Sequence, residues 1–198
     1  MPQLEEISLY LKGIWLLLTG DQRGFDYLDN SAAGVIRSFA AILWSLPAMA
    51  VIWASTRYYY LSNMPEGTSA GLPFILKLMT IDLISWIVPI ALIAALAKPL
   101  AFGELLADVI VTTNWISVPL LYAAAVPAAL SLMVPASDDF AALLSLIVMM
   151  VSIAAVFMLL KTITGKHTLL AFTLTALYLL PPLMAGEWLR DALGLFPV

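Results

Sequence analysis

The stretch LPFILKLMTIDLISWIVPIALIAALA, residues Leu72–Ala97, decides the fold of this chain. As a helix it would reach roughly 39 Å, which exceeds the roughly 30 Å hydrocarbon core of a bilayer. It nevertheless carries Lys77 and Asp82 well inside its ends. Because an ionisable side chain at the centre of a membrane helix costs about 2.5–3.5 kcal/mol on insertion scales, each one is a functional-site hypothesis.

The composition extends this membrane character to the whole chain. Hydrophobic residues make up 63% of the 198 residues, charged residues make up 11%, and the mean hydropathy is +1.00. Soluble domains are about 25% charged. We therefore expect an all-α, polytopic membrane helix bundle of five transmembrane helices, with interfacial amphipathic helices at both termini. The net charge of −4 argues against a nucleic-acid partner, and the absence of cysteine excludes thiolate metal sites.

Hydrophobic runs and turn residues divide the chain into three parts. We expect residues 1–33 to form a cytoplasmic amphipathic segment, residues 34–186 a five-helix transmembrane domain, and residues 187–198 an interfacial segment. The predicted spans are about 35–56, 72–97, 104–134, 140–160 and 168–186. The pair Pro181-Pro182 predicts that the last turns of the fifth span are not regular helix, since proline lacks a backbone N–H.

Both ends of the chain have an amphipathic pattern. The N-terminal stripe consists of Leu4, Ile7, Leu11, Ile14 and Leu18. Its spacing predicts a helix that lies in the membrane interface with Trp15 at headgroup level, or one that packs on the transmembrane bundle. Near the C-terminus, Trp188 and several leucines alternate with Arg190 and Asp191, which predicts a second interfacial helix.

The polar run Gly20–Gly34 precedes the first span. Asp29, Asn30 and Ser31 offer side-chain oxygens that can cap the following helix. Carboxylates in such a run can also bind calcium, but this run lacks the spacing and the distal glutamate of an EF-hand loop. We therefore interpret it as a helix cap and not as a metal site.

Lysine and arginine residues near the span ends predict the orientation. With the N-terminus inside, six of them lie on the cytoplasmic side and Arg57 and Arg190 on the other, while Lys77 lies within a span. The six are Lys12, Arg23, Arg37, Lys98, Lys161 and Lys166. We expect an integral protein of a bacterial plasma (inner) membrane, with the N-terminus cytoplasmic and the C-terminus outside.

Asp82 is the centre of the candidate intramembrane polar site. Lys77 lies about 140° round the helix from it, so the two do not pair, and we expect Lys77 to reach water at the outer end. The short turn after the second span predicts an antiparallel hairpin with the third span. This hairpin places Asp82 near the level of Ser117 and Tyr122, with Asn114 deeper. We therefore expect Asp82 to face the third span and to hydrogen bond one of these residues.

No motif in the chain carries enzymatic chemistry. The sequence lacks phosphate-binding glycine loops, zinc-binding histidine–glutamate motifs and nucleophile elbows, and His167 is the only histidine. We expect no catalytic residue, no metal and no cofactor.

The layout and one short run carry a family resemblance. Five spans, an amphipathic N-terminal segment and an outside C-terminus resemble the Yip1-like membrane proteins. The run GVIRSF, residues Gly34–Phe39, looks like that of small bacterial members. The glycine- and tyrosine-rich motifs of the eukaryotic trafficking members do not occur. The resemblance implies a non-enzymatic accessory or membrane-organising protein that binds other membrane proteins or lipids.

Two functions therefore stand as hypotheses. The first is a non-catalytic bundle whose partners are the lipid bilayer and other membrane proteins, or further copies of itself. The second is a small transporter or channel component that uses Asp82 as a proton or cation site.

Overall fold

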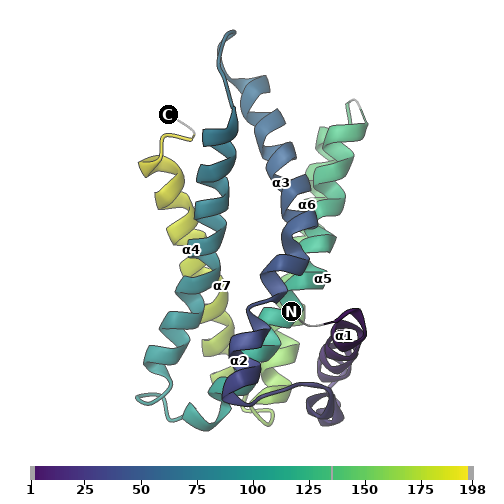
Figure 1. Cartoon of the computed structure of the whole chain (residues 1–198), viewed down its shortest axis with the longest axis vertical. Helices are drawn as coiled ribbons and strands as arrows, with labels where there is room; N and C mark the ends of the chain where they lie inside the picture. The colour runs from purple at the N-terminus through teal and green to yellow at the C-terminus, as the bar shows by residue number, and fades with distance from the viewer. Residues whose placement is uncertain (1–2, 135, 196–198) are drawn as a thin grey trace.

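The computed structural model describes residues 3–134 and 136–195, which form helices joined by turns, with no strand among them (Figure 1). Near the N-terminus lie α1 (Leu4–Leu18), the 3₁₀ helix η1 (Gln22–Tyr27) and α2 (Ala32–Ser38). The longer helices are α3 (Ala41–Asn63), α4 (Leu72–Leu96), α5 (Leu106–Met133), α6 (Asp138–Ile163) and α7 (Thr168–Ala192). A short 3₁₀ helix, η2 (Gly103–Leu105), leads into α5.

Five helical segments are long and apolar enough to cross a membrane, which confirms the predicted fold class. They are Ala32–Asn63, Leu72–Leu96, Gly103–Met133, Asp138–Ile163 and Thr168–Ala192. Successive segments run in opposite directions (Figure 1). The end of the bundle that carries α1, η1 and α2 also carries the α4–α5 and α6–α7 turns, and we call it the α1 end. The opposite end, with the α3–α4 and α5–α6 loops, is the far end.

The long helices pack unevenly on one another, and α6 and α7 also contact each other. α4 packs chiefly along α7, whereas α5 packs along α3 and α6. α4 has few contacts with α3 or with α5, and Figure 1 shows α3 and α4 drawing apart from the loop that joins them at the far end. Gly186 of α7 faces α4, where a Cβ atom would make an ordinary contact of 3.7 Å with Ser85 Oγ. We call the thinly packed boundary between α3 and α4 the α3–α4 seam.

α1 packs on the bundle, which is one of the two alternatives left open by its sequence. Ile7, Ile14 and Leu17 are buried in the core cluster formed with α5 and α6. Tyr10 stacks on Trp115 of α5 with 4.7 Å between ring centroids. The helix thereby closes the core at the α1 end.

A second apolar strip of α1 stays uncovered. Leu4 is 71% exposed and Trp15 is 67% exposed. On a helical projection Leu4, Ser8 and Trp15 share one exposed strip beside the buried face of α1, and Lys12 and Glu5 follow on the next exposed strip. α1 therefore has one apolar face for the bundle and another, narrower one for its surroundings.

The predicted cap before the first span is confirmed at Ser31. Its Oγ accepts a hydrogen bond from Gly34 N at 3.1 Å, and Ser31 N donates to Asp29 Oδ1 at 3.0 Å. Asp29 also pairs with Arg37 in the last turn of α2. Hydrogen bonds from Ser31, with the nearby Arg37 guanidinium, lower the pKa of Asp29.

The prediction of a separate helix at the C-terminus is wrong. α7 continues without a break through Pro181 and Pro182 to Ala192, so residues 187–192 are its last turns. The two prolines remove backbone donors, but their φ is compatible with a helix, and packing on α4 holds the end of α7 in place. Residues 196–198 of that predicted segment, and residues 1–2 of the N-terminal one, lie outside the described residues.

Candidate functional site

Asp82 finds its hydrogen-bond partner on α3. Trp53 Nε1 donates to Asp82 Oδ2 at 2.6 Å, and both side chains are partly buried. This contact crosses the α3–α4 seam, where the two helices otherwise touch little. This hydrogen bond joins the two helices at this level of the seam.

The prediction that Asp82 hydrogen bonds the third span is wrong. Its predicted depth is not at fault, because Trp86, one turn further along α4, does reach Asn114 of α5. The error is in the direction round the helix axis. α4 lies along α7 and not along α5, and this rotation turns Asp82 toward α3.

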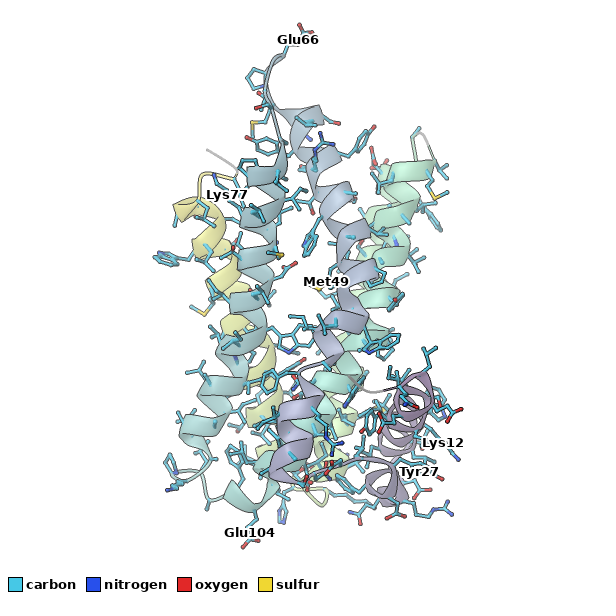
Figure 2. The ribbon with its side chains drawn as sticks, viewed as in Figure 1. Lys12, Tyr27, Met49, Glu66, Lys77 and Glu104 are labelled. Carbon is cyan, nitrogen blue, oxygen red and sulfur yellow. The ribbon has the colours of Figure 1, made fainter. Side chains whose placement is uncertain are left out.

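Lys77 caps the end of α7. Its Nζ donates to the carbonyl oxygen of Leu193, the C-cap residue, at 2.6 Å. The side chain therefore ends on a helix C-terminus, where a cation is favourable, and not in open water as the sequence predicts. Figure 2 shows Lys77 at the far end, beside the end of α7. Asp82 lies five residues, or about 7.5 Å, deeper along α4.

Arg190 is the basic residue in the last turn of α7. It lies close to the level set by the contact between Lys77 and Leu193. α3 and α4 each contribute one residue to the contact across the seam, an indole donor and a carboxyl acceptor. Sequence analysis missed Trp53, because a tryptophan in an apolar span carries no signal of its partner.

A second polar contact set joins three elements nearer the α1 end, and Asn114 is its centre. Asn114 Oδ1 accepts from Trp86 Nε1 at 2.9 Å, and Nδ2 donates to Ser38 Oγ at 2.8 Å. Ser117 Oγ donates to the Asn114 carbonyl at 2.5 Å. Asn114 and Ser38 are each 1% exposed. These bonds tie α4 and the end of α2 to α5, so they fix the bend between α2 and α3.

Of the sequence-predicted candidates, the structure brings together only Asn114 and Ser117. Tyr122 belongs to neither contact set. Its hydroxyl donates to the Trp44 carbonyl at 3.3 Å. Tyr178 of α7 does join this level, because its hydroxyl donates to the Thr113 carbonyl at 3.3 Å. Ser38 and Trp86 complete the Asn114 set. The common depth of Trp86 and Asn114 in the hairpin was the one sequence signal that could have found the pair.

The chemistry available to these groups is limited. The Asn114 set consists of neutral groups that hydrogen bond one another, and it contains no nucleophile next to a base. Within residues 3–134 and 136–195, no group of three or more histidine, aspartate and glutamate side chains could hold a metal ion. The two sets hold helices in register, and Asp82 is the one ionisable acid among them.

Fold and polar contacts together define an all-helical, polytopic membrane protein with five spans. Comparison of the chain with protein-family models, with curated proteins and with solved structures finds no match.

Proposed function

We propose that the chain is a non-enzymatic, Yip1-like accessory or membrane-organising protein, which binds lipids and other membrane proteins. The observation that carries this proposal is the two-sided α1. Its buried face fixes it to α5 and α6, while Leu4 and Trp15 form an exposed apolar strip beside that face. Helices of this kind bury their apolar strip about 5–10 Å into the boundary between headgroups and acyl chains.

The proposed orientation has the α1 end in the cytoplasm, across a bacterial plasma membrane. The six cations that predict this orientation belong to elements of the α1 end, and Arg57 and Arg190 belong to the far end. Exposed aromatic side chains support two interface levels, with Trp15 at one end and Tyr58 and Trp188 at the other.

A labelling experiment tests the position of α1. The chain has no cysteine, so single cysteines can carry a fluorophore at chosen positions. In proteoliposomes with lipids brominated on their acyl chains, a label on Trp15→Cys should be quenched strongly. A label on Glu5→Cys, on the polar strip of the same helix, should be quenched weakly. Equal quenching at the two positions would contradict the proposal.

Partner binding is tested in native membranes. A photo-cross-linker at Leu4 should give discrete adducts with other membrane proteins. Trp15→Gln should reduce these adducts, because it removes the large apolar side chain of the strip, and Glu5→Gln, on the polar strip, should leave them unchanged. Adducts that survive Trp15→Gln at full yield would separate partner binding from α1 and count against the proposal.

The contact between Asp82 and Trp53 supports a second function, a small proton or cation transporter. Asp82 is an intramembrane acid, and it lies at the thinly packed α3–α4 seam. A transporter whose helices move relative to one another would need its proton or cation site at such a boundary. In proteoliposomes, a proton or cation gradient that wild type dissipates and Asp82→Asn does not would favour transport. Flux no faster than in protein-free vesicles would exclude it.

A further inference from the structure

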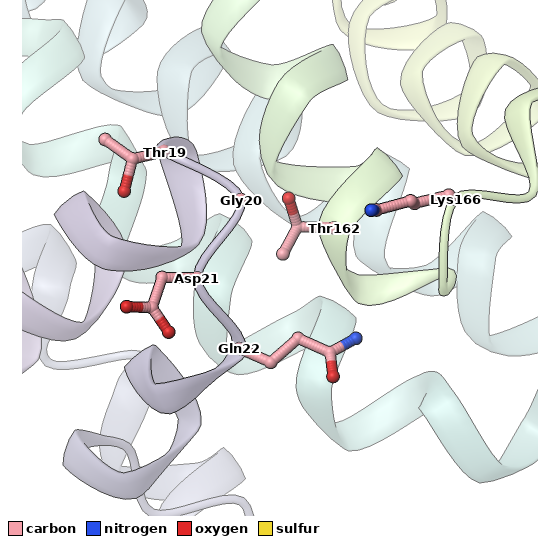
Figure 3. Close-up of a pocket in the computed structure, with 6 residues that line it drawn as sticks. All are labelled: Thr19, Gly20, Asp21, Gln22, Thr162 and Lys166. Carbon is pink, nitrogen blue, oxygen red and sulfur yellow. The ribbon is translucent and has the colours of Figure 1, made fainter.

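A hollow of about 550 Å³ lies at the α1 end, between the turn that follows α1 and the loop that joins α6 to α7 (Figure 3). Its lining residues are Thr19, Gly20, Asp21, Gln22, Thr162 and Lys166. The two segments are far apart in the sequence. The hollow therefore exists because α1 packs on the bundle.

Lys166 gives the hollow its positive charge. Figure 3 shows its ammonium beside Thr162 and on the same side as the Gln22 amide. Neither ion pair of the described residues involves it. By contrast, three other cations of the α1 end are engaged: Arg23 with Asp21, Arg37 with Asp29, and Lys12 over the Tyr27 ring at 4.6 Å.

Asp21, the one acid in the lining, does not cancel this charge. Its carboxylate accepts from Arg23 Nε at 2.9 Å and from Arg23 Nη2 at 2.6 Å. These hydrogen bonds lower the pKa of Asp21, so it is ionised and its charge is balanced by Arg23. In Figure 3 the carboxylate is turned away from Lys166.

The backbone fixes the place of Lys166. Gly165 has φ of +60° and Lys166 has φ of +71°, a region that lysine rarely adopts. The conformation is held by Gly165 N donating to the Thr162 carbonyl and Lys166 N donating to the Lys161 carbonyl at 2.9 Å.

The lining has donors left for an anion. The hydroxyls of Thr19 and Thr162 already donate to the carbonyls of Leu16 and Met158. The ammonium of Lys166 remains, and the exposed amide of Gln22 lies beside the same space. Both are donors that suit the oxygens of a phosphate group.

We propose that this hollow binds a phosphate group, and that the group is the headgroup of an anionic lipid. The inference rests on the proposed function for its lipid source, because it needs the α1 end to lie at a membrane interface. The exposed Leu4 and Trp15 on the adjacent α1 would keep acyl chains at the same level. The ammonium of Lys166 then pairs with the phosphate of a lipid next to α1.

Lipid retention by the purified chain, measured by native mass spectrometry, tests this site. Wild type should retain phosphatidylglycerol in preference to phosphatidylcholine. Lys166→Gln should weaken phosphatidylglycerol binding about fivefold, the worth of one lysine at an anionic surface. Lys166→Arg should keep it. The matched control is Lys98→Gln, a lysine of the same end that does not line the hollow, and it should bind like wild type.

The outcomes separate this site from the proposed function. If Lys166→Gln binds phosphatidylglycerol like wild type, or Lys98→Gln loses as much, the site is wrong. If the protein binds inorganic phosphate but does not bind phosphatidylglycerol selectively, the phosphate group does not come from a lipid and that part of the proposal is wrong. Displacement of phosphatidylglycerol by inorganic phosphate supports a headgroup seated through its phosphate. Quenching of the label on Trp15→Cys should be the same with or without Lys166→Gln, so α1 insertion stands or falls separately.

Discussion

At the scale of single residues, tryptophan supplies the polar partner twice within the spans. Trp53 donates to Asp82 and Trp86 donates to Asn114, each from a neighbouring helix. An indole combines a large apolar body with one N–H donor and no acceptor. It can therefore satisfy one buried acceptor without adding a charge or a second polar group to an apolar environment.

This role of Trp53 predicts how Asp82 responds to substitution. Asp82→Asn keeps an acceptor for the indole N–H, so stability in detergent should change little. Asp82→Leu leaves that N–H without a partner, which should cost about 1–3 kcal/mol. The measurement is thermal unfolding of the purified chain. In the Trp53→Phe background the loss of stability caused by Asp82→Leu should be smaller, because the indole N–H that it would leave unpaired is absent. Equal stability of the Asn and Leu variants in wild-type background would show that the contact contributes nothing.

Asn114 should tolerate substitution less well, because it serves two partners. Asn114→Leu removes the acceptor of Trp86 and the donor to Ser38, in a site where Asn114 is 1% exposed. Each buried group left unpaired costs about 1–3 kcal/mol, so the loss should exceed that of Trp86→Phe. Ser117→Ala is the control, since it removes only a hydroxyl that bonds its own helix. Thermal unfolding that ranks Trp86→Phe as the more damaging change would contradict this order.

At the scale of elements, α1 and η1 cross at two glycines. A Cβ atom on Gly24 would lie 2.4 Å from the Gly13 carbonyl oxygen and 2.6 Å from Leu17 Cγ. One of these neighbours is the backbone of Gly13, and the other is the buried side chain of Leu17. The crossing therefore has no room for even one methyl group, and the hollow beside it depends on the same approach.

Gly24→Ala should consequently push η1 away from α1 and loosen this corner of the structure. Overpacking of this kind costs about 1–3 kcal/mol. Hydrogen exchange should rise in α1 and η1 while α3 to α7 keep their protection. Gly103→Ala is a matched control, because a Cβ atom there meets nothing within 4 Å and its φ is not positive. Unchanged exchange in Gly24→Ala would mean that the crossing adjusts without cost.

The junction between η1 and α2 should depend on pH. The folded state lowers the pKa of Asp29, so the carboxylate stabilises the junction at neutral pH. This stabilisation is present above the ordinary aspartate pKa of about 4 and is lost as the pH falls through the lowered value. Exchange of the α2 amides should therefore rise below about pH 4. Asp29→Asn should abolish that rise, and a rise of the same size in this variant would assign the effect to another group.

At the scale of the whole molecule, hydropathy predicted the spans well and the lateral arrangement poorly. The stretch Leu72–Ala97 was predicted as the second span, and α4 is Leu72–Leu96. Apolar length and the Ser31 cap are local, so the sequence carries them. Which helix lies beside α4 is not local. It decides that Asp82 faces Trp53, and the spacing of residues within α4 says nothing about it.

The end of α7 shows the same limit. A local rule predicted a break at Pro181 and Pro182, yet the helix continues to Ala192. Its continuation depends on contacts with α4, at Gly186 and at the Leu193 carbonyl that accepts from Lys77. These contacts come from residues that are distant in sequence, so no window around the prolines contains them.

The last prediction concerns the orientation of the molecule in its membrane. Five spans put the two termini on opposite sides, and the six lysine and arginine residues of the α1 end predict that this end is cytoplasmic. Cysteines at Ser69 and Ser137, in the far-end loops, should react with an impermeant maleimide in intact cells. Gly103→Cys, at the α1 end and sterically free, should react only after permeabilisation. Labelling of Gly103→Cys in intact cells, with Ser69→Cys protected, would invert the orientation and move the phosphate site to the outer leaflet.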